Sequence, residues 1–381
     1  MLKKYTSVVV TILFTGMFLY CSQEKDVIKI GEYGSLTGTT ATFGISTRNG
    51  IDMAVAKVNQ EGGILGKQIE IIVEDDQGKP EEAATAIKKL INQDKVIAIL
   101  GEVASSRSLA GAPICQTAKI PMITPASTNP KVTEVGDFIF RVCFIDPFQG
   151  EVMATFSRKT MNLKRAALLT DVKNDYSVTL AEYFHKTFTE LGGEIVAEES
   201  YSEGDTDFKA QLTSIKSKKP ETIFIPGYYT AVGLIARQAR ELGMKIPLIG
   251  GDGWDSPRLL EIAGEALENC YFSNHYSTDD PNPLIQDFVR EYKIKYGEVP
   301  DAMAVLGYDA AMVLVEAIRR AGVLDTRKIR DEIAATRDFQ GVSGKITIDS
   351  NRNAEKSAVV IKITEGKLVY TETVSPAGPA G

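Results

Sequence analysis

The chain has 381 residues, with 43 Lys and Arg against 50 Asp and Glu, two His and four Cys, and a formal net charge of −7. This length predicts about two domains of roughly 100–200 residues each, and the 44% hydrophobic and 24% charged fractions are ordinary for a globular protein. The acidic balance argues against nucleic acid as a partner, because phosphate binding needs a basic face. Two histidines leave little room for a histidine-based metal site, and we expect neither metal nor cofactor.

The first 21 residues differ from the rest of the chain. Lys3 and Lys4 precede an apolar run over residues 8–20, Cys21 follows it, and the next five residues are polar. This three-part layout is typical of an export signal. The apolar run is too short for a membrane-spanning helix, which needs about 20 residues.

The cysteine at the end of this run resembles the acceptor of a bacterial lipoprotein signal. The match is imperfect, because such signals prefer a small residue before the cysteine and this chain has Tyr20. We expect a signal peptide over residues 1–20, a lipidated Cys21 and a lipid-anchored tether over residues 21–26. An uncleaved or differently cleaved signal is the alternative.

The remaining cysteines are far apart in the sequence and lie in apolar stretches. They are Cys115, Cys143 and Cys270, and no CxxC spacing occurs among them. We therefore expect them to be small buried hydrophobic residues, with no disulfide required.

From residue 27 onward, short apolar strands alternate with amphipathic helices. In the first half the pattern predicts strands over 27–33, 69–74 and 96–100 and helices over 49–60 and from Pro80. In the second half it predicts strands over 166–170, 194–199, 222–226 and 247–250, and helices over 176–191, 208–216 and 232–242. This alternation is typical of an α/β protein with two doubly wound parallel sheets.

The C-terminal part has a different pattern. It predicts three helices, over 284–296, 304–321 and 327–335, followed by hairpin-like strands over 345–348, 358–364 and 367–371. Residues 374–381 are expected to form a disordered tail, since Pro, Gly and Ala dominate its end.

Enzyme signatures are absent from the sequence. It contains no GxxxxGK[ST], no GxSxG, no HExxH, and no GxGxxG after the first strand. His185 and His275 have no positioned Ser or Cys partner, so neither is a candidate catalytic residue. We therefore expect a binding protein and not an enzyme.

A candidate anion site follows the predicted strand 96–100. Residues 101–106 read Gly-Glu-Val-Ala-Ser-Ser and lead into a helix, so Ser105 and Ser106 would lie at a helix N-terminus at the carboxyl edge of the sheet. Free N–H groups and the positive end of the helix dipole favour an anion there. The alternative is that Ser105 only caps its own helix.

Several motifs in order along the chain resemble one family. They are Ser-Leu-Thr-Gly at 35–38, Val-Asn-Gln-Glu-Gly-Gly-Ile-Leu-Gly at 58–66, Pro-Ala-Ser-Thr-Asn-Pro at 125–130 and Arg-Gln-Ala-Arg-Glu-Leu-Gly at 237–243. Together they are similar to the type I periplasmic binding proteins for leucine, isoleucine and valine, the substrate-binding components of ABC transporters. The resemblance covers nearly the whole chain after residue 26.

The resemblance implies two Rossmann-like lobes joined by three hinge crossings, with the ligand in the cleft between them. Lobe 1 would comprise residues 27–146 and 275–355, and lobe 2 residues 147–274 and 356–373.

The resemblance also assigns roles to residues of the cleft. Ser105 would bind the α-carboxylate of an amino acid, with Ala126 and Thr128 as further partners from lobe 1. From lobe 2, Tyr176 and Tyr228 would close over the ligand, where ordinary helix-start or sheet-edge packing is the alternative for each tyrosine.

Asp252 would pair with the α-ammonium, unless it only caps the helix that follows it. A free amino acid presents an anion and a cation a few ångströms apart, so these roles suit its chemistry, and Phe43 and Val103 would add an apolar wall. Arg107 departs from the family pattern, and two alternatives are open for it: a solvent-facing residue or a partner for an acidic ligand.

The function that follows is a monomeric lipoprotein at the periplasm or cell surface. It would bind an amino acid, of the branched-chain class by resemblance, and deliver it to the permease subunits of an ABC importer. The alternative is a ligand-sensing receptor or regulatory domain of the same fold for amino acids, amides or urea.

Overall fold

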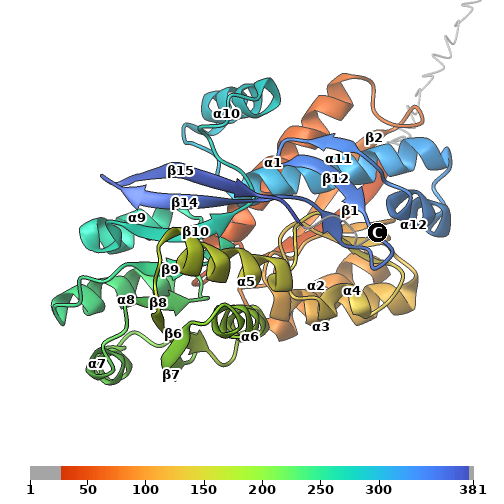
Figure 1. Ribbon diagram of the computed structural model, residues 1–381. Helices are drawn as coiled ribbons and strands as arrows, with labels where there is room; N and C mark the ends of the chain where they lie inside the picture. Colours follow the sequence, from red (N-terminus) through yellow and green to blue (C-terminus); the bar gives the residue numbers. More distant parts are fainter. Residues whose placement is uncertain (1–26, 377–381) are drawn as a thin grey trace, which may run out of the picture.

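The structure is a computed structural model that describes residues 27–376, and it has two α/β lobes (Figure 1). Lobe 1 is built on a five-stranded parallel sheet in the order β2-β1-β3-β4-β5. Its strands are β1 (Val27–Gly34), β2 (Gln68–Asp75), β3 (Ile99–Leu100), β4 (Met122–Thr124) and β5 (Ile139–Arg141). The helices between them are α1 (Ala41–Gln60), α2 (Pro80–Asn92), α3 (Ser105–Ala118) and α4 (Lys131–Glu134).

Helices cover both faces of this sheet. Successive residues of a strand point to opposite faces, so each face carries apolar side chains that pack against helices. Leu100 and Ile123 belong to the same hydrophobic cluster as residues of α1, whereas Ile99 and Met122 pack with residues of α2 and α3. Ligand-facing loops therefore arise at the carboxyl edge of the sheet, where β3 and β4 end.

Lobe 2 is built on a seven-stranded sheet in the order β15-β14-β10-β9-β8-β6-β7. Its five strands from β10 to β7 run parallel, and β14 and β15 are antiparallel additions. The strands are β6 (Arg165–Asp171), β7 (Glu194–Tyr201), β8 (Thr222–Ile225), β9 (Leu248–Gly250), β10 (Cys270–Asn274), β14 (Ala358–Thr364) and β15 (Lys367–Val374).

The helices of lobe 2 lie between these strands. They are α5 (Asp146–Thr155), the π-helical turn η1 (Phe156–Thr160), α6 (Asp175–Glu190), α7 (Lys209–Ser217), α8 (Tyr229–Glu241), the 3₁₀ turn η2 (Asp252–Trp254), α9 (Pro257–Ala263) and the 3₁₀ turn η3 (Gly264–Leu267).

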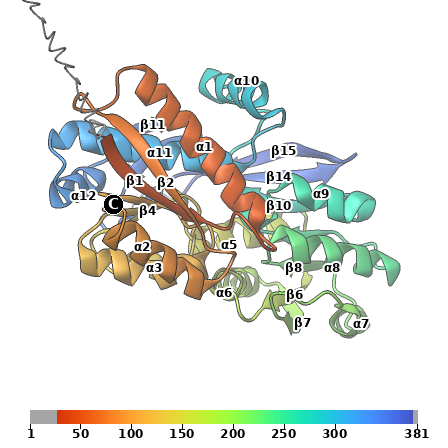
Figure 2. The same ribbon diagram turned by 180° about the vertical axis from the view of Figure 1, so that it is seen from behind.

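The chain returns to lobe 1 after β10 and adds three helices and a small antiparallel sheet. These elements are α10 (Pro283–Tyr296), α11 (Ala302–Ala321), α12 (Thr326–Ala334), β11 (Phe339–Gly341), β12 (Gly344–Ile348) and β13 (Ala354–Glu355). Figure 2 shows α1 and α11 packed together on one side of lobe 1. Their backbones touch at two glycines, Gly50 and Gly307, where a Cβ would overlap the carbonyl oxygens of Ala304 and Thr47.

Three segments connect the lobes: residues 142–145 before α5, the segment from residue 275 after β10, and residues 356–357 before β14. The lobe boundaries expected from the sequence, at residues 146, 274 and 355, lie next to these three connecting segments. Because each lobe is assembled from separate stretches of chain, the lobes are interleaved.

The predicted two-lobed α/β fold is confirmed. Cys115, Cys143 and Cys270 are free and buried, as expected. The prediction that residue 374 belongs to a disordered tail is wrong, because Val374 pairs with Ala358 in β15.

The predicted signal peptide, Cys21 and tether lie outside the described residues, as do residues 377–381. Within residues 27–376, no helix is both long and apolar enough to cross a membrane.

Replacing Gly50 by Ala should destabilise the protein by about 1–3 kcal/mol, because the new methyl group overlaps a backbone oxygen of α11. In a helix with free space around the glycine, the same change would stabilise the protein by about 1 kcal/mol. The steric overlap and the higher helix propensity of Ala therefore change the free energy of unfolding in opposite directions. Urea unfolding measures the difference. Gly34→Ala is the control, since its Cβ would lie 3.5 Å from Gly44, an ordinary contact. A Gly50→Ala variant as stable as the parent would contradict the close helix contact.

Candidate ligand-binding site

The N-terminus of α3 forms the lobe 1 side of the candidate site. Ser105 and Ser106 begin this helix just after β3, and within residues 27–376 their N–H groups have no hydrogen-bond acceptor. The Ser105 hydroxyl accepts a hydrogen bond from the Asn129 N–H (3.2 Å), and the capping position is Ala104. The alternative that Ser105 caps its own helix is therefore wrong, and its N–H remains available to an anion.

The loop after β4 lies beside this helix end. Buried Arg141 donates to the carbonyl oxygens of Ser127 and Asn129, which holds the loop in place. Between them, Thr128 is fully buried, and its hydroxyl has no hydrogen-bond partner among the described residues. Ala126, also buried, precedes them. A buried hydroxyl without a partner is costly, and the Asp146 carboxyl is the near group of this chain on which the Thr128 side chain acts.

Asp252 lies opposite, at the carboxyl end of β9 in lobe 2. It is 3% exposed, its Oδ2 is 2.9 Å from Nε2 of His275, and its Oδ1 has no partner among residues 27–376. The Asp252 N–H donates to Oε1 of Gln149 (2.7 Å), which fixes the start of the turn η2. The cap of the following helix is Ser256 instead, so the alternative that Asp252 only caps that helix is wrong.

His275 sets the state of this carboxylate. The imidazole is buried and stacks on Phe144 with 3.9 Å between ring centroids. Burial lowers the pKa of His275, while the hydrogen bond to Asp252 opposes that shift. A neutral His275 donates from Nε2 to Oδ2 of Asp252, and Oδ1 of Asp252 keeps no partner among the described residues.

A second carboxylate, Asp146, was missed by the sequence analysis. It begins α5 directly after the first lobe connection, it is fully buried, and neither carboxylate oxygen has a hydrogen-bond partner among the described residues. Its N–H donates to the Thr128 carbonyl (2.9 Å), which places it next to the lobe 1 loop. Burial raises the pKa of the Asp146 carboxyl well above its ordinary value; the Thr128 hydroxyl acts to lower this pKa, and the nearby charge of Asp252 acts to raise it. The available signal was a lone acid inside the apolar run 142–148.

Aromatic side chains form a wall beside these polar groups. Tyr176 stacks on Tyr228, with 5.4 Å between ring centroids and 12° between planes, and its hydroxyl accepts a hydrogen bond from the Gly253 N–H (3.2 Å). Phe43 of lobe 1 meets the Tyr228 ring edge-on at 5.4 Å. The charges of Asp252 and Asp146 both act on the Tyr176 hydroxyl, so this wall adjoins the two carboxyls.

The other two predicted residues occupy different places. Val103 is buried in the hydrophobic cluster that also contains Phe43 and Ala126. The Ser106 hydroxyl accepts a hydrogen bond from the Asp175 N–H of lobe 2 (3.0 Å), so its oxygen is engaged in a contact between the lobes. In this arrangement Ser106 offers its backbone N–H to the site.

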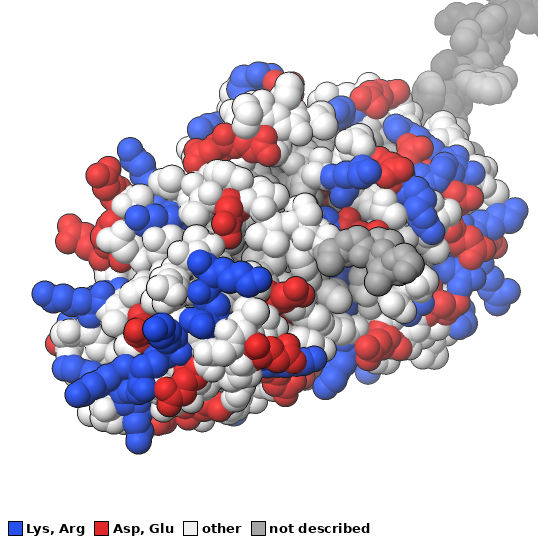
Figure 3. Space-filling model, in the orientation of Figure 1, with Lys and Arg blue, Asp and Glu red and all other residues white. Residues whose placement is uncertain are grey.

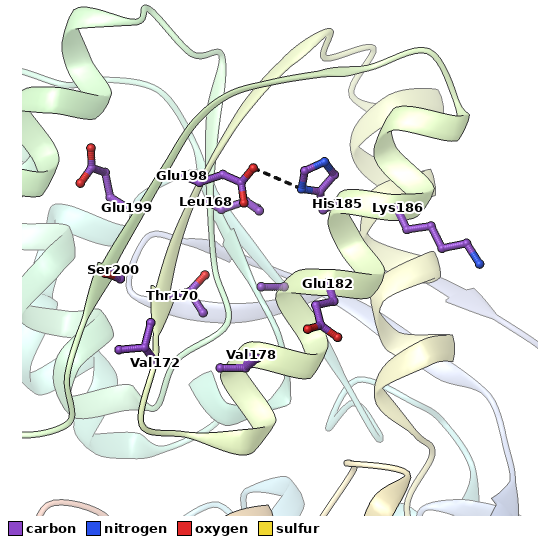
Figure 4. A pocket seen from close by; sticks show the side chains of 11 residues that line it. Leu168, Thr170, Val172, Val178, Glu182, His185, Lys186, Glu198, Glu199 and Ser200 are labelled. Carbon is purple, nitrogen blue, oxygen red and sulfur yellow. Dashed lines mark ion pairs between the residues drawn. The ribbon is translucent and has the colours of Figure 1, made fainter.

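A separate hollow of about 500 Å³ lies on lobe 2, between α6 and β7 (Figure 4). His185 and Glu198 form an ion pair across it, with 3.4 Å between Nδ1 and Oε1. None of the predicted site residues lines this hollow, and it contains neither the α3 N-terminus nor the buried carboxyls. It is therefore not the candidate site. On the face shown in Figure 3, exposed acidic and basic side chains lie interspersed over both lobes. The acidic side chains of the candidate site differ from these because they are buried.

Comparisons with known proteins agree with this geometry. The family model described as periplasmic binding protein matches residues 27–367. A leucine-, isoleucine-, valine-, threonine- and alanine-binding protein of Pseudomonas aeruginosa is 30% identical over 344 residues, which cover 88% of this chain and 91% of that protein.

Two solved structures are similar over almost their whole length. A leucine-binding protein, LivK, from Thermotoga maritima is 46% identical with a TM-score of 0.89, over 92% of this chain and 99% of that chain. The branched-chain amino acid substrate-binding protein LivJ of Streptococcus pneumoniae, in complex with isoleucine, is 35% identical with a TM-score of 0.88, over 92% of this chain and 100% of that chain. With a family match that spans most of the chain and two lobes that meet at a buried polar site, this protein belongs to the periplasmic binding proteins, a family of solute-binding proteins.

Proposed function

We propose that this chain is the solute-binding component of an ABC importer and that its ligand is a free amino acid with an apolar, branched side chain. The observation that carries the proposal is a pair of buried carboxyls: both oxygens of Asp146 and Oδ1 of Asp252 have no hydrogen-bond partner among the described residues, while the N–H groups of Ser105 and Ser106 are free. Unpaired buried charge is costly, and a ligand ammonium would relieve that cost.

The α-carboxylate would lie at the α3 N-terminus, where N–H groups and the helix dipole favour an anion. The Thr128 hydroxyl lies between the two ends of the site, because the Thr128 carbonyl holds Asp146 and the neighbouring Asn129 contacts Ser105. Tyr176, Tyr228 and Phe43 would surround the side chain with aromatic surface. Binding of leucine or isoleucine by the similar proteins supports the apolar, branched class.

Capture for transport is favoured over signalling because the chain pairs a solute-binding fold with a lipoprotein-like signal at residues 1–21. The protein would act as a monomer outside the cytoplasmic membrane and deliver its ligand to permease subunits. A ligand-sensing domain for amino acids, amides or urea is the second candidate. A receptor for amides or urea would need no ammonium site, so the two buried carboxyls argue for an amino acid as the ligand.

Calorimetry against the twenty amino acids, urea and simple amides tests the ligand class. We expect leucine, isoleucine or valine to bind. We also expect 4-methylpentanoate, which is leucine without its ammonium group, to bind at least about 100-fold more weakly, because it lacks the cation that would pair with the buried carboxyls. Equal binding of leucine and 4-methylpentanoate, or tight binding of urea alone, would overturn the proposal.

Asp252→Asn should abolish measurable leucine binding, because the amide keeps the shape of the side chain and removes its charge. The thermal midpoint of the ligand-free protein should change little, since an amide oxygen can still accept from His275. Circular dichroism checks the fold of the variant. A variant that binds leucine with the parent affinity would refute the role of Asp252.

Leucine affinity should rise as the pH is raised from about 5 towards about 8, with protons released on binding. Because its pKa is raised, the Asp146 carboxyl keeps its proton in the closed, ligand-free site. In the unfolded chain the same carboxyl would lose its proton at about pH 4. A ligand ammonium favours the ionised carboxyl, so it lowers this pKa and displaces the proton. Calorimetry in buffers of different ionisation enthalpy counts the protons.

Asp146→Asn is the control for this experiment, because its amide cannot titrate. It should bind leucine more weakly and release fewer protons. Identical proton release in the parent and in Asp146→Asn would show that another group loses the proton when leucine binds. That result would contradict this role for Asp146.

Cys21→Ser should move the protein from the membrane fraction to the soluble extracytoplasmic fraction, if residue 21 carries the lipid that its sequence context predicts. Fractionation followed by immunoblotting measures this, with leucine affinity as a control that should not change. Retention of Cys21→Ser in the membrane fraction would show that the anchor is not a lipid on this cysteine.

A further inference from the structure

Arg107 lies at the seam between the two lobes. It is in the first turn of α3, with its side chain only 3% exposed, and its Nη2 is 3.1 Å from Oε1 of Glu203. Glu203 follows β7 in lobe 2, so this ion pair joins the lobes. The same Glu203 oxygen accepts a hydrogen bond from Thr39 of lobe 1 (3.3 Å). Glu203 therefore contacts lobe 1 at two points.

Three carboxyls of this chain already surround Arg107. In its own lobe, the carboxyls of Glu102 and Asp76 interact with the guanidinium, and Glu203 adds a third from lobe 2. Burial raises the pKa of Glu102 to about 8, with the Asp76 charge as the next cause. Burial likewise raises the pKa of Asp76. One guanidinium thus serves three carboxyls, and an acidic ligand side chain would add a fourth.

Other contacts cross the seam on both sides of the site. They are Thr42 Oγ1 with Ser256 Oγ (2.9 Å), Thr230 Oγ1 to the Thr39 carbonyl (2.7 Å), Asn129 Nδ2 to Thr179 Oγ1 (2.8 Å), and the Asp175 N–H to Ser106 Oγ (3.0 Å). All of these are neutral hydrogen bonds. Among the ion pairs of the described residues, Arg107–Glu203 joins the lobes at this seam with one partner almost fully buried.

We infer that Arg107 and Glu203 are positioning residues for the site: they clasp the two lobes around the ligand and set how long it is retained, and Arg107 is not a receptor for an acidic ligand. The site accordingly takes amino acids with uncharged side chains. This inference rests on the proposed function, because the ligand is what brings the lobes together.

The Arg107–Glu203 ion pair stabilises the closed form of the protein and not the open form. When the lobes part, Glu203 moves away and water reaches Arg107, so the open protein loses little if Glu203 is neutral. When the lobes close, a neutral residue at 203 leaves the buried guanidinium without its partner from lobe 2. Removing the charge of Glu203 therefore raises the free energy of the closed state selectively. Arg107→Gln is a less clean variant, since it also leaves two buried acids without their cation.

The experiment compares the parent with Glu203→Gln, using L-leucine as the probe. We expect about three- to tenfold weaker binding, as for a partly exposed ion pair. The loss should lie in a faster dissociation rate in stopped-flow measurements, with the association rate unchanged. The ratio of leucine, isoleucine and valine affinities should stay the same, since no ligand contact is altered.

Glu194→Gln is the matched control. Glu194 also pairs with an arginine, Arg165, at 2.9 Å, but both residues belong to lobe 2. Its leucine affinity and dissociation rate should equal those of the parent. Hydrogen exchange of the Asp175 amide, which donates across the seam, gives a readout that does not depend on affinity: in ligand-saturated protein it should be faster in Glu203→Gln and unchanged in Glu194→Gln.

The outcomes separate the clasp from the proposed function. If none of the twenty amino acids binds the parent, the proposed function fails, and the clasp is then judged from the Asp175 exchange of the ligand-free variants. Parent-like dissociation and exchange in Glu203→Gln would overturn the clasp, as would an equal effect of Glu194→Gln. Tight binding of L-aspartate or L-glutamate by the parent would overturn the exclusion of acidic ligands.

Discussion

The burial of two carboxyls that keep oxygens without hydrogen-bonding partners among the described residues is the constraint on which this structure depends. Asp146 and Asp252 are buried where the lobes meet. Such groups remain in a protein interior only when contacts with the surrounding residues fix their positions. Gln149 holds the backbone of Asp252, His275 holds one of its oxygens, and the Thr128 carbonyl holds Asp146. The energy that these groups lose to desolvation becomes available when a cation enters the site.

The same arrangement couples binding to closure. The α3 N-terminus and Thr128 belong to lobe 1, while Asp252 and Tyr176 belong to lobe 2. In the proposed binding mode, a zwitterion would therefore satisfy both halves only when the lobes meet. A ligand can shift the balance between open and closed forms only by its preference for one of them. Charges of opposite sign on opposite lobes give an amino acid that preference. Polar contacts across the seam, among them Arg107–Glu203, then add to it.

The fold was predictable because its strands and helices carry strong, regular hydrophobic patterns, such as residues 222–226 and 232–242. Short strands were harder: β4 and β5 have three residues each, too few to show a period. The site was predictable where a residue follows a strand at the carboxyl edge, as Ser105 and Asp252 do. Asp146 was hidden by its apolar neighbours. The pairing of His275 with Asp252 and the direction of Arg107 depend on contacts between residues far apart in sequence, which no local pattern reveals.

The interleaving of the lobes constrains the order in which the protein can fold. Lobe 1 needs α11, which packs against α1 through Gly50 and Gly307, and lobe 2 needs β14 and β15 from the last twenty residues described. A growing chain that has emerged as far as β10 therefore contains two unfinished lobes, one without its helical cover and one with the edge of its sheet unpaired. Neither core can close early, so the chain stays loosely folded until its C-terminal segment is present. For a chain exported through the signal proposed at residues 1–20, late closure would keep the polypeptide unfolded during its passage across the membrane.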